Sequence, residues 1–350
     1  MRFGTKLSAL ALSGVMALAA TVGAKAADPE FTFTIHHFLS PKATTQTQMI
    51  EPWVKRIEEE SEGRIKFEIF PAMSMGGKPP ELYRQVRDGA ADIVWTVIGY
   101  TPGVFPRTEV FELPSVHVGS ALQTNLAIQY SMDLIKDDFS DVHPLLVHVH
   151  AGNALHLVQP LDLYSAESSF EGMKLRTPSR TGAWLIEAMG AEPVGMPVPA
   201  LPQALAKGTV DGAFIPFEIV PPLKVHELTS MSVEGRNKER FGTSVFLYAM
   251  NKDSYNSLPD DLKKIVDDAS GRDFAIAMGN VWDDAENPGK SLQYGSGSEI
   301  IRLDSEATAN IAAMGEKIVK RWVEEVEAKD INGKAIVRWA RAAMKNYKPE

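Results

Sequence analysis

The sequence predicts an α/β protein built from two lobes, and two observations carry that prediction. Strand-like and amphipathic helix-like segments alternate along the chain, and the alternation recurs on both sides of residue 150. This order is typical of largely parallel sheets with helices on both faces. A chain of 350 residues is long enough for two such units. Since no low-complexity linker separates the halves, we expect the lobes to be interwoven.

The first half supplies three strands and the helices between them. Residues 31–38 are rich in β-formers, and residues 64–70 alternate apolar and polar side chains. Between them lies an amphipathic helix whose apolar face carries Trp53 and Ile57. A third strand is predicted at 92–98, after a second helix that ends at a glycine.

The second half repeats the pattern and ends in helices. Helices are expected at 181–189 and 199–206, and 243–250 forms a long β-rich stretch that we expect to run between the lobes. The last segment carries apolar side chains at helical spacing. The remaining predicted strands are 145–149, 173–177, 192–196 and 211–215.

The N-terminus has the three parts of a secretory signal peptide. Arg2 and Lys6 give a positive start, an apolar run follows, and Ala24-Lys25-Ala26 ends it with a small-x-small cleavage site. The alternative is a membrane anchor, but the run is shorter than the ~20 residues that span a bilayer. We therefore expect cleavage after Ala26, which removes residues 1–26 and leaves a mature protein in the periplasm.

Composition excludes several classes of function. The chain has 36 Lys and Arg against 45 Asp and Glu, a net charge of −9, and no cysteine. Nucleic acid needs clustered positive charge, so we expect no nucleic-acid partner. Without cysteine there is neither a disulfide framework nor a thiolate nucleophile. We also expect a monomer.

The motifs of the common catalytic sites are missing. No G-x-S-x-G elbow, H-E-x-x-H helix or phosphate-binding loop occurs, so we expect no cofactor and no metal. His148 and His150 share one face of a strand and are possible metal ligands or the base of a periplasmic enzyme. No third ligand stands at a supporting spacing, which favours two histidines that line a cleft or bond to the backbone.

Three stretches resemble one family of transport proteins. They are GGKPPELYRQVRDGAADIVW at 76–95, FEGMKLRTP at 170–178, and MGAEPVGMP at 189–197 with QAL and GTVDG after it. In this order the chain resembles the substrate-binding proteins of tripartite ATP-independent periplasmic (TRAP) transporters, of the dicarboxylate-binding-like family. The resemblance covers essentially the whole mature chain.

The resemblance implies a type II-like periplasmic binding protein, in which a hinge closes two lobes around a small organic acid. Each lobe is expected to hold a mixed, mainly parallel sheet flanked by helices, with shared strands and a long helix. Lobe I would comprise 27–150 with about 243–285, and lobe II would comprise 151–242 with about 286–350. The resemblance also implies membrane permease subunits as partners, and an arginine that grips the ligand carboxylate, which matches Arg176.

Arg176 also suits this role on chemical grounds, since a guanidinium holds a carboxylate through two parallel hydrogen bonds. Ile215 stands where acidic-ligand relatives have asparagine, and the crossover near His150 lacks their second arginine. These departures favour an aromatic or other apolar monocarboxylate; a dicarboxylate or keto acid is the alternative. The candidate ligand-binding residues are Arg176, Trp95, Phe38, His37, Asn153, Phe214, Phe217 and Tyr100.

Overall fold

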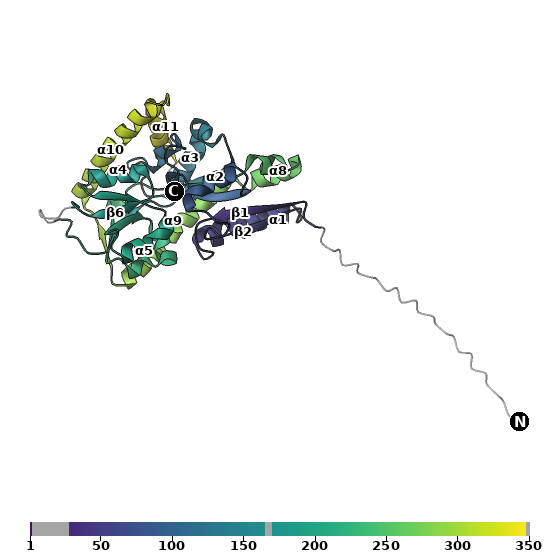
Figure 1. Ribbon diagram of the computed structural model, residues 1–350, viewed down its shortest axis with the longest axis horizontal. Helices are drawn as coiled ribbons and strands as arrows, with labels where there is room; N and C mark the ends of the chain where they lie inside the picture. The colour runs from purple at the N-terminus through teal and green to yellow at the C-terminus, as the bar shows by residue number, and fades with distance from the viewer. Residues whose placement is uncertain (2–27, 165–169, 348–350) are drawn as a thin grey trace.

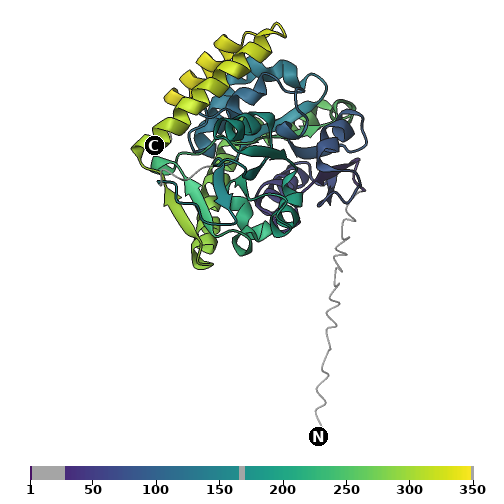
Figure 2. The same cartoon turned by 60° about the vertical axis from the view of Figure 1, so that its left-hand side comes forward.

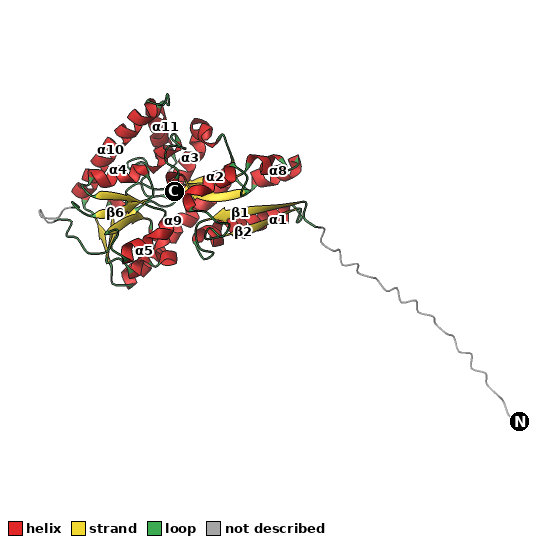
Figure 3. Ribbon diagram, in the orientation of Figure 1, coloured by secondary structure: helices red, strands yellow, loops and turns green. Residues whose placement is uncertain are grey.

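The computed structural model describes residues 28–164 and 170–347, together with Met1. The predicted signal peptide therefore lies outside the described residues, apart from Met1. Two mixed sheets flanked by helices form the two lobes (Figure 1, Figure 3), which confirms the predicted α/β two-lobed fold. Lobe I is defined below by the first sheet and lobe II by the second.

The sheet of lobe I has five strands in the order β2-β1-β3-β10-β4. The first three run parallel, and β10 is antiparallel to both of its neighbours, so a strand from late in the chain lies inside the first lobe. The strands are β1 (Phe31–His37), β2 (Ile65–Phe70), β3 (Ile93–Val97), β4 (His143–Val149) and β10 (Val245–Met250).

The sheet of lobe II has six short strands in the order β11-β9-β5-β8-β6-β7. Strand β6, which carries Arg176, pairs in parallel with β7 and β8 and so lies inside the sheet. The strands are β5 (Ala154–Leu157), β6 (Lys174–Thr177), β7 (Glu192–Gly195), β8 (Gly212–Ile215), β9 (Met231–Glu234) and β11 (Glu299–Arg302).

Three connections join the lobes. The chain passes from β4 to β5 and returns from β9 to β10, and the long helix α9 (Gly271–Gly295) packs against elements of both sheets. Figure 1 shows α9 between the β1–β2 side and the β6 side of the molecule. Helix α9 approaches the turn η7 (Phe217–Ile219) so closely that a Cβ on Gly289 would lie 1.8 Å from the Phe217 carbonyl oxygen. Only glycine allows this contact.

The C-terminal helices cross from one lobe to the other. Helix α10 (Ser305–Glu327) packs on α4 (Arg180–Ala188) of lobe II, and α11 (Gly333–Asn346) packs on α3 (Ala121–Ile135), which covers the lobe I sheet. Figure 2 shows the two C-terminal helices side by side along one edge of the molecule. The last helix thus lies on lobe I rather than with the rest of the C-terminal segment on lobe II, because its apolar face is buried against α3.

The remaining helices are short (Figure 3), and they pack either on a sheet, as α1 and α2 do, or on another helix, as α6 does on α9 and α8 on α1. Their apolar sides provide the amphipathic pattern seen in the sequence; Trp53 and Ile57, for example, are buried. These helices are α1 (Glu51–Glu60), α2 (Leu82–Arg87), α5 (Leu201–Ala206), α6 (Val220–Leu223), α7 (Lys252–Asn256) and α8 (Asp260–Asp268).

The lobes are closed against one another. Arg180 at the start of α4 forms a two-pronged ion pair with Glu109 of lobe I, with Nε–Oε1 2.8 Å and Nη2–Oε2 2.5 Å. The backbone N–H of Val198 in lobe II donates to the Tyr100 hydroxyl of lobe I at 2.9 Å. Gly99 lies against Ser179, where a Cβ would be 2.7 Å from the serine Cβ. Each of these contacts joins a residue of lobe I to a residue of lobe II, so they form only when the lobes are closed.

Candidate functional site

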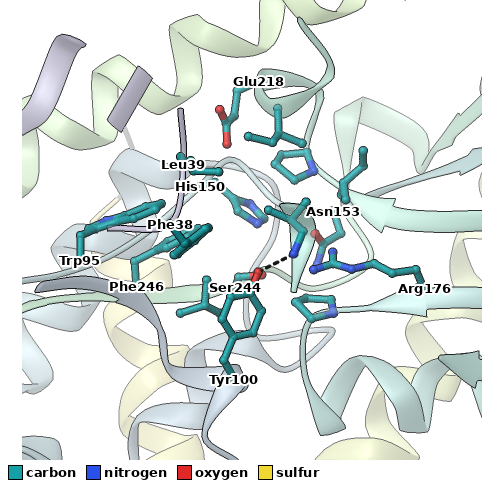
Figure 4. A pocket seen from close by; sticks show the side chains of 16 residues that line it. Phe38, Leu39, Trp95, Tyr100, His150, Asn153, Arg176, Glu218, Ser244 and Phe246 are labelled. Atoms are coloured by element: carbon teal, nitrogen blue, oxygen red, sulfur yellow. Dashed lines mark hydrogen bonds between the residues drawn. The ribbon is translucent and has the colours of Figure 1, made fainter. Parts of the chain in front are cut away.

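A cavity lies between the lobes and is lined by residues of both. Lobe I contributes mainly aromatic side chains and lobe II contributes one arginine, apolar residues and one acid (Figure 4). The lining residues are Phe38, Leu39, Trp95, Val97, Tyr100, His150, Asn153, Arg176, Pro178, Val198, Ile215, Pro216, Glu218, Ile219, Ser244 and Phe246.

Arg176 is held rigidly from the lobe II side. Its Nε donates to the Met196 carbonyl at 3.0 Å, and its Nη1 donates to the Phe214 carbonyl at 3.1 Å. Two backbone acceptors therefore fix the plane of the guanidinium before any ligand arrives. The side chain is only 2% exposed, and Figure 4 shows it reaching from its strand toward Asn153 and the cavity.

The positive charge of Arg176 is uncompensated. Its Nη2 has no hydrogen-bond partner, and no carboxylate forms an ion pair with it among residues 28–164 and 170–347. Burial lowers the pKa of Arg176, and the nearby Tyr100 hydroxyl offsets part of that effect. A buried cation without a counterion is costly unless an anion from outside binds to it. The guanidinium is therefore available to an anion that enters the cavity.

Asn153 and Tyr100 flank the guanidinium. The side-chain Oδ1 of Asn153 is buried without a partner among the described residues, and its backbone is fixed by bonds to Gly242 and Phe241. Tyr100, at the end of the turn η3 (Ile98–Tyr100), accepts the Val198 N–H and so closes the cavity from lobe I. The Tyr100 hydroxyl keeps its own proton for donation, whereas the unpaired Asn153 Oδ1 can only accept a hydrogen bond (Figure 4).

Three stacked rings form an aromatic wall on the lobe I side, namely Phe38, Trp95 and Phe246. The Trp95 ring lies 4.7 Å from the Phe246 centroid at an interplanar angle of 7°, and 4.9 Å from Phe38. Trp95 is oriented because its Nε1–H donates to His148 Nε2 at 2.9 Å. An aromatic body packs well against such a wall.

His148 supports the aromatic wall through its hydrogen bond with Trp95. Since its Nε2 accepts from Trp95, the ring must be neutral there, and burial lowers the pKa of His148 to about 3. No group of three or more His, Cys, Asp or Glu side chains within the described residues could hold a metal ion. His150 lies on the cavity itself, as expected for a cleft residue.

His150 presents a donor to the cavity. Its Nδ1 accepts from the Gly152 backbone N–H at 2.9 Å, and burial lowers its pKa well below the ordinary value. In the neutral ring the proton must therefore sit on Nε2. This Nε2–H makes no hydrogen bond with any residue that the structure describes.

Three candidate residues lie elsewhere. His37 is buried in lobe I with its Nε2 3.1 Å from Gln46 Oε1, because it points away from its neighbour Phe38. The Phe214 ring packs 5.8 Å from Phe241, and only its carbonyl reaches the site, since the next residue Ile215 takes the cavity face.

Phe217 is the third residue outside the cavity. Its ring is fully buried, 4.8 Å from His156, with Arg240 and Lys290 over its face. The turn η7 directs Phe217 toward α9 and Glu218 toward the cavity. Arg176, Trp95, Phe38, Asn153 and Tyr100 do come together on the cavity.

Several lining residues were not among the sequence candidates. The alternation within 243–250 offers a signal for Phe246, since one face of that strand must meet the crossover. Glu218 carries no comparable signal: a glutamate two residues after a proline is ordinary in any surface turn. Its importance appears only from the fold.

The fold and the site together define a class of protein: a two-lobed α/β binding protein with a cavity between its lobes. The chain belongs to bacterial extracellular solute-binding protein family 7, the DctP family, whose model matches residues 35–117 and 166–325. This family serves TRAP transporters, so the predicted family is confirmed. No helix within the described residues is long and apolar enough to cross a membrane.

Solved structures of similar proteins hold aromatic acids. A marine metagenome TRAP solute-binding protein, specific for aromatic acids and complexed with 3-hydroxybenzoate, is 39% identical with a TM-score of 0.88, covering 92% of this chain and 100% of that chain. One from Rhodoferax ferrireducens with copurified benzoate is 36% identical with a TM-score of 0.86, covering 90% and 98%. Among curated proteins, the Comamonas testosteroni outer membrane transporter protein TsaT is 22% identical over 349 residues, 98% of each chain.

Proposed function

We propose that this protein is a periplasmic receptor for an aromatic monocarboxylate, which it delivers to the membrane permease of a TRAP transporter. One observation carries the proposal: a rigid, buried guanidinium faces the interlobe cavity with its Nη2 unpaired and no counterion among the described residues. A ligand carboxylate supplies the missing charge and the missing acceptors. The 3-hydroxybenzoate and benzoate complexes of the similar proteins support the same ligand class.

The aromatic wall supports a ring as the ligand body. A ring the size of a phenylalanine side chain buries roughly 150–250 Å². At ~25 cal/mol per Å² this contributes about 4–6 kcal/mol before the costs of binding. Ile215 and Val198 supply apolar surface from the opposite lobe.

The cavity does not suit a second carboxylate. Arg176 is the one Lys or Arg among the lining residues that the structure describes, and the acid Glu218 also faces the space. A C4-dicarboxylate would bury one charge beside an acid and without a cation, which is costly. It would also leave the aromatic wall largely uncovered.

Ligand binding favours the closed arrangement because both lobes contribute to one site. Arg176 comes from lobe II, whereas the aromatic wall comes from lobe I. A ligand that touches both makes contacts that exist only when the lobes are together, and this shifts the population toward closure. The ion pair between Arg180 and Glu109 then adds to the closed form alone. The closed protein would dock on the permease.

The family and the N-terminal sequence both support a location in the periplasm. The resemblance of residues 1–26 to a signal peptide supports export and cleavage after Ala26. An enzymatic role for His148 finds no support, since its ring is committed to Trp95.

Titration calorimetry with benzoate and succinate tests the proposed ligand class. We expect benzoate to bind at least about tenfold more tightly than succinate, a difference of about 1.4 kcal/mol. Benzoate covers the aromatic wall and has no second carboxylate that would be buried without a cation. Succinate binding as tightly as benzoate, or more tightly, would discard the aromatic monocarboxylate in favour of a dicarboxylate. Recovery of benzoate chemically unchanged after incubation checks that the protein is a receptor and not an enzyme.

A further inference from the structure

Glu218 is a carboxyl group that lines the ligand cavity without a partner. Its side chain is 8% exposed, and neither of its oxygens makes a hydrogen bond with the described residues. Its position is nevertheless fixed. The backbone N–H of Glu218 donates to Glu286 Oε1 at 3.0 Å, and the close contact at Gly289 holds the whole turn against α9.

The cations nearest to this turn are engaged by other carboxylates. Arg240 donates to Glu234 Oε2 at 2.6 Å and to Glu286 Oε2 at 2.9 Å, and Lys290 donates to Glu234 at 2.8 Å. None of them forms an ion pair with Glu218. Glu218 is therefore held in the cavity wall without an ion pair to any Lys or Arg of residues 28–164 and 170–347.

The Glu218 carboxyl holds its proton more tightly than an exposed glutamate does. Burial, reinforced by the nearby Glu286 carboxylate, raises the pKa of Glu218 to about 8. A protonated carboxyl offers one O–H donor and an acceptor oxygen. Such a group suits a partner that both donates and accepts, and it disfavours an ammonium, which requires the ionised form.

His150 lies on the same side of the cavity. Its Nε2–H is a donor without a partner among the described residues, as its Nδ1 accepts from Gly152. Figure 4 shows Glu218 pointing toward His150, whereas Arg176 enters from another side beside Asn153. The cavity thus has two polar regions, with the aromatic wall along one side.

We propose that Glu218 and His150 together bind a hydroxyl group on the ring of the ligand, so that hydroxylated aromatic acids are the preferred ligands. A hydroxyl accepts from one of these groups while it donates to the other. The inference rests on the proposed function, since the carboxylate on Arg176 sets where the ring lies. An unsubstituted ring would leave two buried polar groups unpaired, which costs affinity.

Calorimetry with benzoate, 3-hydroxybenzoate and 4-hydroxybenzoate tests the inference on the wild-type protein. We expect at least one hydroxybenzoate to bind about fivefold or more tightly than benzoate, the effect of roughly one net hydrogen bond. Glu218→Gln, which keeps a donor and an acceptor, should retain a preference for the hydroxylated ligand. Glu218→Leu should reduce the affinity ratio to about one.

The control is Glu68→Leu, which removes an exposed glutamate on the edge strand β2 and should keep the wild-type ratio. If benzoate binds as tightly as both hydroxybenzoates, the hydroxyl site is wrong while the proposed function stands. If Glu218→Leu keeps the wild-type ratio, Glu218 does not read the hydroxyl and the inference is overturned. If the wild-type protein binds none of the three acids, it is the proposed function that fails.

Discussion

Replacing Arg176 with alanine should weaken binding of benzoate by roughly 30-fold to several thousand-fold. Truncating one partner of a buried charged pair typically costs about 2–5 kcal/mol. Here the loss falls at the upper end, because the guanidinium is the sole Lys or Arg side chain on the described cavity wall. Titration calorimetry of the variant measures the loss directly. Arg176→Lys should recover only part of the affinity, because an ammonium lacks the planar fork.

Two further measurements show that the loss is local. The unliganded Arg176→Ala protein should melt close to the wild type, since removal of a buried charge without a counterion offsets the loss of the hydrogen bonds to the Met196 and Phe214 carbonyls. Arg338→Ala, an exposed arginine on α11, should bind benzoate as the wild type does. Wild-type affinity in the Arg176→Ala protein would remove this residue from the site.

The second large effect concerns stability. Replacing Arg240 with alanine should lower the free energy of unfolding by about 3–5 kcal/mol, the usual cost of breaking a buried ion pair from one side. Arg240 is 7% exposed and bridges Glu234 on β9 to Glu286 on α9. Its loss leaves the buried Glu286 carboxylate without an ion pair among the described residues, whereas Glu234 keeps Lys290 and Arg302. Urea denaturation of the variant and the wild type gives the difference.

Arg302 provides a matched control for Arg240. It contacts the same carboxylate, with Nε 2.9 Å from Glu234 Oε1, but its side chain is 62% exposed. Exposed ion pairs contribute about 0–1 kcal/mol, so Arg302→Ala should be nearly neutral. If both substitutions lower the free energy of unfolding equally, burial does not determine how much each arginine contributes to stability.

The sequence predicts the fold because the hydrophobic pattern of most segments matches the helix or strand that each segment forms in the structure. The predicted strands at 31–38, 64–70, 92–98 and 243–250 all appear in the lobe I sheet, with ends shifted by one or two residues. Strands β5, β9 and β11 were not anticipated. Each has four residues, as do the predicted strands β6, β7 and β8. The latter three alternate with the predicted helices at 181–189 and 199–206, and this β-α-β order makes them recognisable despite their length.

The candidate site likewise contains residues that a local sequence pattern predicts and residues that only long-range contacts place. Arg176 is recognisable because its neighbours in 170–178 form a local motif, and the turn after β6 leaves the sheet at the cleft. Glu218 depends instead on Glu286, which lies 68 residues away on α9 and fixes the turn. Phe217 was expected on the cavity and lies against α9, since the same contact decides which side chain of the turn faces inward. No local pattern contains that information.

A crystal structure of the protein with 3-hydroxybenzoate tests the central claim most directly. The account predicts a ligand enclosed between the lobes, with a carboxylate oxygen within hydrogen-bonding distance of Arg176 Nη2. The ring should lie against Phe38, Trp95 and Phe246, and both lobes should contact it. A ligand that binds one lobe alone, or whose carboxylate bonds elsewhere and leaves Arg176 Nη2 unpaired, would contradict the claim that this buried guanidinium is the anchor around which the lobes close.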